Sequence, residues 1–259
     1  MSQENNSSSG DTCNQKTGRD SILNTFGIGC FVLILLGIVL LIPAVRAARE
    51  AARRMCCVPD EVRTAMHVYH DMYGSFPPAY STDAEGKPLH SWRVLLLPAF
   101  GDIGELANIR LDEPWDSEYN SQFHNKMPRF HGYCCLSRPE KEIAQGLTPY
   151  RMIIGPDTIS NGPNSTKFSD ITRGTSNVIM VVETSIPVPW MKPEDLPQSA
   201  LQNGVVSSVP RRGKPVVLGI GSPHANGANV AMCDGSCEFF TNEISPEELL
   251  EKSRIRKPE

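Results

Sequence analysis

An uncharged, apolar stretch near the N-terminus constrains this chain more than any other feature. Residues 21–45 carry no charged side chain, and the stretch lies between Asp20 and Arg46. As a helix with a rise of 1.5 Å per residue, its apolar core of about twenty residues would cover roughly 30 Å, the thickness of a bilayer's hydrocarbon layer. No other run in the 259 residues is comparably apolar. We therefore expect an uncleaved transmembrane helix over residues 21–45, with the lipid bilayer as its partner.

The composition changes on both sides of this stretch. Residues 1–20 are rich in Ser, Asn and Gln and have few apolar side chains to bury, which predicts a disordered tail. Residues 46–74 contain strong helix formers and predict a helical stem. Residues 75–259 consist of short apolar runs separated by many of the 21 prolines and 20 glycines, which predicts a β-rich globular head. The expected fold class is α+β, with the long transmembrane helix continuing into a head with a mainly antiparallel sheet.

Several local elements can be predicted within the stem and the head. The patterns favour a helix over 60–73 ending at Gly74, a β-hairpin of 228–232 and 237–241, and a short capped helix over 245–251. Runs rich in β-branched residues favour strands at 150–154, 177–183 and 215–220, while 92–97 fits a strand or a helix. The hairpin is the strongest of these predictions, because Asp234 and Gly235 stand between two apolar runs.

The histidines offer two candidate sites. His224 is followed after nine residues by Asp234 and Gly235, and an imidazole with a carboxylate could bind a metal or act as an acid–base pair. No third partner is evident nearby, so we favour a structural role for this motif, as a loop and a turn. His67 and His70 share a helix face but lack the zinc-hydrolase spacing, which favours polar packing. With no catalytic constellation evident, we expect no enzyme activity, cofactor or metal.

The cysteines are compatible with disulfides rather than with common metal or redox motifs. The chain has eight cysteines but no Cys-x-x-Cys pair, which argues against a zinc ribbon or a thioredoxin-like site. Cys233 and Cys237 flank the predicted hairpin turn. They would face one another, and could form a bridge, if the loop consists of the three residues 234–236.

The chain resembles the bacterial family called domain of unknown function 1559. The matching segments are 41–55, 67–80, 91–98, 113–117, 170–177 and 188–196, together with His224 and the Asp234–Gly235 pair. The resemblance implies a prepilin-type N-terminal helix and a head like that of type IV pilins and pseudopilins. It also implies a disulfide between Cys57 and Cys135, because relatives often have cysteines at these two positions. The chain lacks the glutamate that prepilins carry in this helix, which is why we expect an uncleaved anchor.

These observations favour a membrane-anchored, pilin-like structural or interaction protein of the cell envelope, or of a secretion or pilus-like system. The resemblance places the head outside the cytoplasm, although the arginines that follow the apolar stretch favour the cytoplasmic side. The alternative is an extracytoplasmic solute- or carbohydrate-binding module, because Trp92, Trp115 and Trp190 stand near prolines in what look like exposed loops. The net charge of −4 excludes a general nucleic-acid binder.

Overall fold

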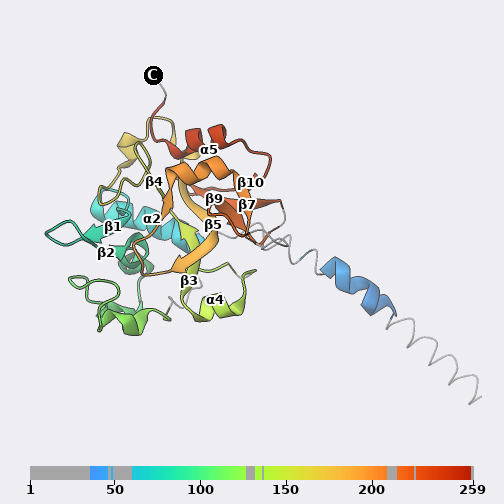
Figure 1. Ribbon diagram of the computed structural model, residues 1–259, viewed down its shortest axis with the longest axis horizontal. Helices are drawn as coiled ribbons and strands as arrows, with labels where there is room; N and C mark the ends of the chain where they lie inside the picture. The colour runs from blue at the N-terminus through green and yellow to red at the C-terminus, as the bar shows by residue number, and fades with distance from the viewer. Residues whose placement is uncertain are drawn as a thin grey trace, which may run out of the picture. The chain divides into compact units, whose positions relative to one another are not determined.

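The computed structural model describes two compact units of the chain, residues 1–51 and 52–259. The described residues are 36–45, 48, 60–126, 132–135, 137–208, 215–224 and 226–257. Figure 1 shows the ribbon of both units. Each unit is considered by itself below.

The predicted transmembrane helix, the main element of the expected fold class, is contradicted by the structure. The described residues 36–45 are helical, and at 1.5 Å per residue these ten residues cover about 15 Å, roughly half of a bilayer's hydrocarbon layer. In the part of the chain that the structure describes, no helix has both the length and the apolar character needed to cross a membrane. The predicted tail, 1–20, and residues 21–35 of the predicted span lie outside the described residues.

The larger unit mixes short helices with antiparallel and parallel strand pairs. Its α-helices are α2 (Asp60–Tyr73), α3 (Trp92–Leu95), α4 (Glu140–Ala144) and α5 (Pro246–Ser253). Its 3-10 helices are η1 (Leu97–Phe100), η2 (Gly104–Asn108), η3 (Asn120–Phe123), η4 (Phe168–Asp170), η5 (Thr175–Asn177) and η6 (Gln198–Asn203). Its strands are β1 (Tyr80–Thr82), β2 (Pro88–Ser91), β3 (Leu147–Arg151), β4 (Ile153–Ile154), β5 (Ile179–Pro189), β6 (Leu196–Pro197), β7 (Val205–Ser207), β8 (Ile220–Ser222), β9 (Gly227–Met232) and β10 (Cys237–Thr241).

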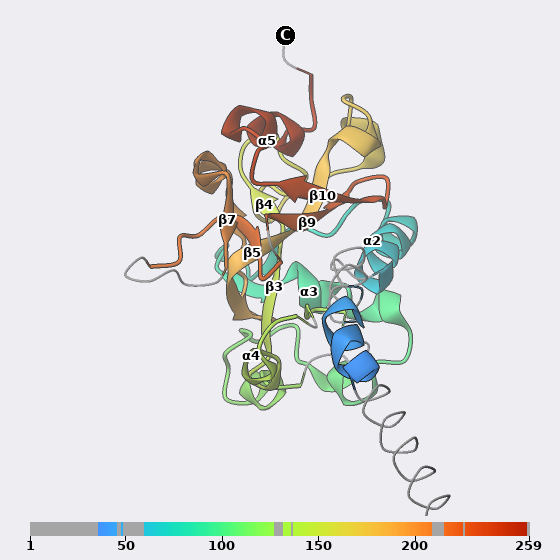
Figure 2. The ribbon, with the colours of Figure 1, turned by 90° about the vertical axis from the view of Figure 1, so that its right-hand side faces the viewer.

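Strand β5 is the centre of the main sheet. The strand order is β10-β9-β5-β8-β7, and β3 also pairs with β5. All of these pairs are antiparallel except β7 with β8. Residues 179–185 of β5 are all buried, so both faces of the strand are covered there. Figure 2 shows β5 among its neighbours, with α5 and α4 at opposite ends of the unit.

Helix α2 forms where the sequence predicts a helix, over residues 60–73. Val62 and Met66 are buried in the main core, as their spacing implies, whereas Tyr73 is largely exposed. Gly74 ends the helix with a positive φ of 75°, and its N–H donates to the carbonyl of His70 at 2.7 Å. Of the predicted stem, 46–47 and 49–59 lie outside the described residues, and α2 packs into the core of the globular unit.

The two C-terminal predictions are also confirmed. β9 and β10 form the predicted hairpin, and Gly235 in its turn has a φ of 85°. Helix α5 begins after Ser245, whose hydroxyl accepts a hydrogen bond from the Glu248 N–H at 3.1 Å.

Other predicted elements differ in type or length. Residues 92–95 form the helix α3, which is the helical alternative for that run, and β5 extends well beyond the predicted strand 177–183. In the third predicted strand, 215–220, only Ile220 belongs to a strand.

The buried carboxylate of Asp195 joins helix α3 to the strands. Asp195 Oδ1 accepts hydrogen bonds from Trp92 Nε1 at 3.0 Å, Arg93 Nη2 at 2.9 Å and the Met152 N–H at 2.9 Å. The side chains of Arg93 and Asp195 are both fully buried. Arg93 also donates to the carbonyl of Tyr150 on β3. This network therefore joins α3, β3 and the segment before β6.

The buried network predicts a large loss of stability when its acceptor is removed. We expect Asp195→Ala to lower the free energy of unfolding by roughly 3–5 kcal/mol, because it leaves the buried Arg93 without a charged partner. Urea unfolding followed by circular dichroism measures the difference. Glu105→Ala is the control, since Glu105 pairs with Lys126 at the surface and exposed pairs contribute about 1 kcal/mol or less. Equal losses for the two variants would contradict this role of Asp195.

Candidate metal centre

Three metal-ligating side chains from distant parts of the chain meet inside the globular unit. They are Cys135, Glu183 and His224, and their ligand atoms all lie within 4.8 Å of one another. Cys135 Sγ is 3.7 Å from His224 Nε2. The three residues are between 0% and 4% exposed. We call this group the buried trio.

The strand register brings two members of the trio together. Glu183 lies on β5 opposite Tyr150 of β3, and its neighbour Thr184 pairs with Ile220 of β8. Because β5 and β8 are antiparallel, the residues that follow Ile220 run back along β5 past Glu183. His224 follows the end of β8 and is held there by its backbone N–H, which donates to Ser222 Oγ at 3.0 Å.

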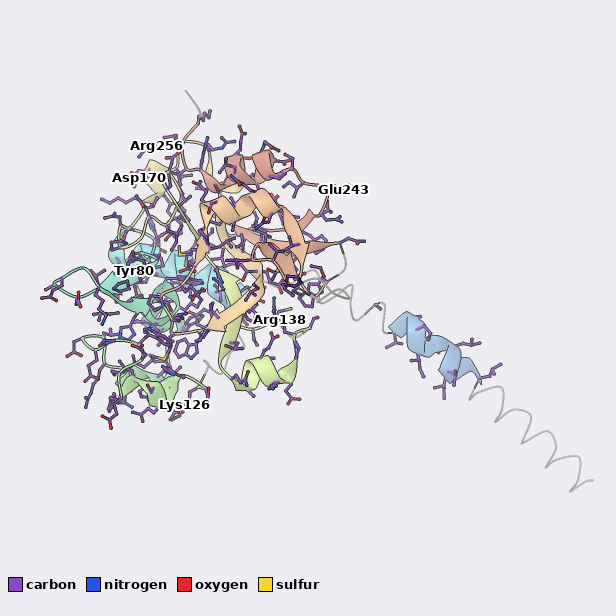
Figure 3. The ribbon with its side chains drawn as sticks, in the orientation of Figure 1. Tyr80, Lys126, Arg138, Asp170, Glu243 and Arg256 are labelled. Carbon is purple, nitrogen blue, oxygen red and sulfur yellow. The ribbon has the colours of Figure 1, made fainter. Side chains whose placement is uncertain are left out.

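The third member comes from a turn that precedes α4. The Arg138 N–H donates to the carbonyl of Cys135 at 2.9 Å, which closes the turn. The Arg138 guanidinium donates to the carbonyl of Thr184, next to Glu183 on β5, and pairs with Glu142 at 3.2 Å. Figure 3 labels Arg138 between the sheet and α4. The same turn therefore supplies a thiol and a positive charge to the trio.

The buried carboxyl of Glu183 has few neighbouring groups that would stabilise its negative charge. Its side chain is fully buried, and neither oxygen makes a hydrogen bond of ordinary geometry within the described residues. Arg138 Nε is 3.8 Å from Oε1, longer than a hydrogen bond. Burial, and then the nearby Cys135 thiol, raise the pKa of Glu183 well above its usual value, while Arg138 acts in the opposite direction.

The arrangement suits ligation better than nucleophilic catalysis. A cysteine, a histidine and an acid can form a catalytic triad, but such a triad needs access for a substrate. Here all three side chains are buried, and their ligand atoms surround a common point. Thiolate sulfur, imidazole nitrogen and carboxylate oxygen are the ligands that zinc uses in proteins.

The structure separates the two halves of the sequence motif. His224 belongs to the buried trio, whereas Asp234 lies in the hairpin turn, where its Oδ1 accepts hydrogen bonds from the Ser236 N–H at 2.9 Å and from Ser236 Oγ at 2.6 Å. The carbonyl of Gly235 accepts a hydrogen bond from Arg63 on α2. Asp234 and Gly235 therefore shape and anchor the turn, as predicted, but the structural prediction for His224 omitted its neighbours Cys135 and Glu183.

The other predicted histidine pair packs against aromatic rings. His67 lies 5.4 Å from the Phe168 ring and His70 lies 4.2 Å from it, measured between ring centroids. Both also contact Phe76, which is buried in the core. His70 Nε2 accepts a hydrogen bond from the Phe168 N–H at 3.3 Å. The two imidazoles therefore pack against aromatic rings, and His70 also accepts a backbone hydrogen bond.

The predicted bridge between Cys233 and Cys237 does not form. Cys237 pairs with Ala231 in the hairpin register, and the Met232 N–H donates to Ser236, so the loop consists of residues 233–235. This loop is shifted by one residue from the predicted one, and Cys233 is a free, buried thiol. The other predicted bridge includes Cys57, which lies outside the described residues, and it stays a prediction.

The tryptophans that suggested ligand binding are part of the core. Trp92 and Trp190 are fully buried. The Trp190 indole N–H points to the carbonyls of Phe123 and His124, and Trp115 is half-buried beside the His124 ring. The prediction that these tryptophans lie in exposed loops, where they could bind a sugar, is therefore wrong for Trp92 and Trp190.

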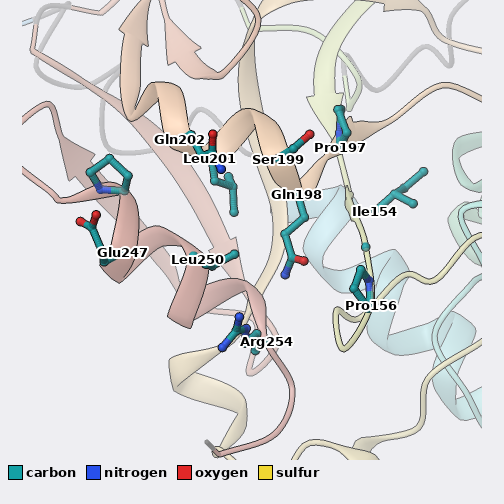
Figure 4. A pocket seen from close by; sticks show the side chains of 12 residues that line it. Ile154, Pro156, Pro197, Gln198, Ser199, Leu201, Gln202, Glu247, Leu250 and Arg254 are labelled. Atoms are coloured by element: carbon teal, nitrogen blue, oxygen red, sulfur yellow. The ribbon is translucent and has the colours of Figure 1, made fainter.

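An open groove lies elsewhere on the unit. Figure 4 shows it between α5, η6 and the segment after β4, with Gln198, Leu250 and Arg254 among its lining residues. Glu247 and Arg254 are the charged side chains among the residues that line it. No member of the buried trio lines the groove.

A comparison with protein families matches residues 46–166 and 210–247 to the family described as "Protein of unknown function (DUF1559)". The chain belongs to this family. No curated protein and no solved structure matches the chain significantly. The matched residues of this DUF1559 protein include Cys135, His224 and Asp234, whereas Glu183 lies between the two matched segments.

Sequence reasoning noticed the members of the trio separately but did not bring them together. The resemblance implies a disulfide for Cys135, the motif predicts a loop for His224, and position 183 appears only as the end of a predicted strand. The signal for Glu183 is its position directly after the apolar residues 178–182. A carboxylate on a fully buried strand needs a compensating group, but the sequence does not show which residues supply it.

The free thiol of Cys233 gives a test of the corrected hairpin. We expect Cys233 to react with iodoacetamide at least about 100-fold more slowly than a small free thiol, because burial, and then Asp234, raise the pKa of its thiol. After unfolding in urea without a reductant, it should be fully alkylated, as measured by peptide mass spectrometry. Recovery of a disulfide-linked peptide containing Cys233 and Cys237 would contradict the structure.

Proposed function

We propose that this protein is a non-enzymatic, pilin-like interaction protein of the cell envelope, whose apolar N-terminal helix packs against the helix of another pilin-like subunit. The observation that carries the proposal is the surface of the helix over residues 36–45. Seven of its side chains are large, apolar and at least 42% exposed: Leu36, Ile38, Val39, Leu40, Leu41, Ile42 and Val45. A helix that is apolar on all sides is normally buried against other elements.

The pattern on this helix suits a second helix as the covering element. Leu36 and Leu40 are four residues apart and form one ridge, to which Val39 adds a neighbour at the three-residue spacing. Residues 36–45 contain no charged side chain that would oppose an apolar partner. The resemblance to pilins, whose N-terminal helices associate with those of neighbouring subunits, points to the same kind of partner.

Two further parts of the proposal concern location and activity. We place the globular unit outside the cytoplasm, as the resemblance to pilins implies. We propose no enzyme activity, because Cys135 and His224, a potential nucleophile and base, are buried with Glu183 and inaccessible to a substrate. The carbohydrate-binding alternative has lost its main support, since Trp92 and Trp190 are core residues.

Site-specific photocrosslinking tests the proposed partner. The full chain is produced in cells with a photoreactive amino acid in place of Leu40, which is 70% exposed. We expect a covalent adduct with another copy of the chain or with another pilin-like protein, identified by mass spectrometry. Lys87, an exposed residue between β1 and β2, is the matched control position and should give no such adduct.

The same experiment can overturn the proposal. Adducts of the Leu40 position with lipid alone would identify a lipid surface, and not a subunit, as the cover of the helix. Equal protein adducts from the Leu40 and Lys87 positions would show that the contact is not specific to the apolar helix.

A further inference from the structure

The buried trio holds three potential metal ligands close together. One of them, the carboxyl of Glu183, has few groups near it that would stabilise its negative charge. Asp195, the other fully buried carboxylate described above, accepts three hydrogen bonds through one oxygen. Glu183 is equally buried, but neither of its oxygens has a hydrogen-bond donor of ordinary geometry in the described part of the chain. A buried carboxylate that has only a distant guanidinium as a partner, and that faces a thiol and an imidazole, is typical of a site that accepts a cation.

The spacing of the ligands fits a tetrahedral zinc ion. Typical bonds of about 2.3 Å to sulfur and about 2.0–2.1 Å to nitrogen, at the tetrahedral angle, place the two ligand atoms roughly 3.6 Å apart. Cys135 Sγ and His224 Nε2 are 3.7 Å apart. The carboxylate of Glu183 lies within 4.8 Å of both atoms, a distance that a small side-chain rotation can shorten.

The local charges also suit a divalent ion. A thiolate at Cys135 and a carboxylate at Glu183 together balance two positive charges, and neutral His224 supplies the third ligand. Arg138, 3.8 Å from Glu183, favours the ionised carboxylate that ligation requires. Metal binding releases the proton of the Cys135 thiol to solvent, so that a lone pair of the thiolate sulfur can bind the metal.

We propose that Cys135, Glu183 and His224 bind one divalent transition-metal ion of the zinc class. The ion would join the turn before α4, the central strand β5 and the segment after β8, which are distant in sequence. Three protein ligands leave one position of a tetrahedral ion for another ligand. An open position is usual in catalytic zinc sites, but the trio is buried and a substrate has no access to it, so the role of the ion would be to fasten these segments. The site does not depend on the partner proposed for the N-terminal helix.

Metal analysis of the full chain tests this site. The protein is purified with a non-thiol reductant, stripped with a chelator, reloaded with Zn²⁺ and freed of excess metal by gel filtration. Elemental analysis should find about one zinc ion per chain. Cobalt in place of zinc should give the thiolate-to-cobalt charge-transfer absorption that a cysteine ligand produces.

The vicinal cysteines provide a matched pair of variants. Cys134 is also buried, and burial raises the pKa of its thiol to about 11, but it is not a member of the trio. We expect Cys135→Ser to lose the charge-transfer absorption and to weaken zinc binding at least tenfold, whereas Cys134→Ser keeps both. Glu183→Gln, which preserves the shape of the side chain, should weaken binding without abolishing the absorption. Circular dichroism of the stripped variants verifies that each is folded.

Three outcomes would overturn the proposal. One is a full chain that is folded and reduced but binds no zinc after reloading. Another is equal zinc binding and cobalt absorption in the Cys134→Ser and Cys135→Ser variants. The third is native protein in which Cys135 is recovered in a disulfide with Cys57, because a cysteine in a disulfide cannot supply a thiolate ligand.

Discussion

The buried carboxyl of Glu183, on the central strand of the sheet, is the constraint on which the interior of this protein depends. Strand β5 pairs with β3, β8 and β9, so it cannot move outward to expose this side chain without breaking the sheet. Burying an ionised carboxylate costs several kcal/mol unless other groups compensate it. Arg138, Cys135 and His224 surround the carboxyl, and the segments that carry them are fixed by contacts with β5 and β8.

Two buried acids illustrate two ways in which the fold accommodates charge. Asp195 is held by donors from Trp92, Arg93 and the backbone, and it stabilises the junction of α3 with the sheet. Glu183 instead faces a guanidinium that is too distant for a hydrogen bond, together with two metal-ligating groups. In the first arrangement the protein itself supplies three donors and a paired guanidinium to the carboxylate, whereas a metal ion would complete the second. This difference connects the packing of the core to the proposed zinc site.

The sequence predicts local elements well here because their signals are local. The turn glycine at 235, the cap at Ser245 and the apolar face of α2 depend on neighbouring residues. The trio depends on contacts across the sheet, such as the 89-residue separation between Cys135 and His224, which no spacing rule reveals. The tryptophans were misjudged because nearby prolines suggested exposed loops. The membrane span was expected from hydropathy, but no helix in the described residues has the length and apolar character to cross a membrane. Family membership supports the resemblance but supplies no role for these residues.

X-ray absorption spectroscopy at the zinc edge of the reloaded full chain tests the central claim most directly, because it reports the ligand atoms themselves. The account predicts one sulfur at about 2.3 Å and the remaining ligands, nitrogen or oxygen, at about 2.0–2.2 Å. Cys135→Ser should remove the sulfur contribution. A spectrum with only nitrogen and oxygen ligands, or with several sulfurs, would contradict a centre formed by Cys135, Glu183 and His224.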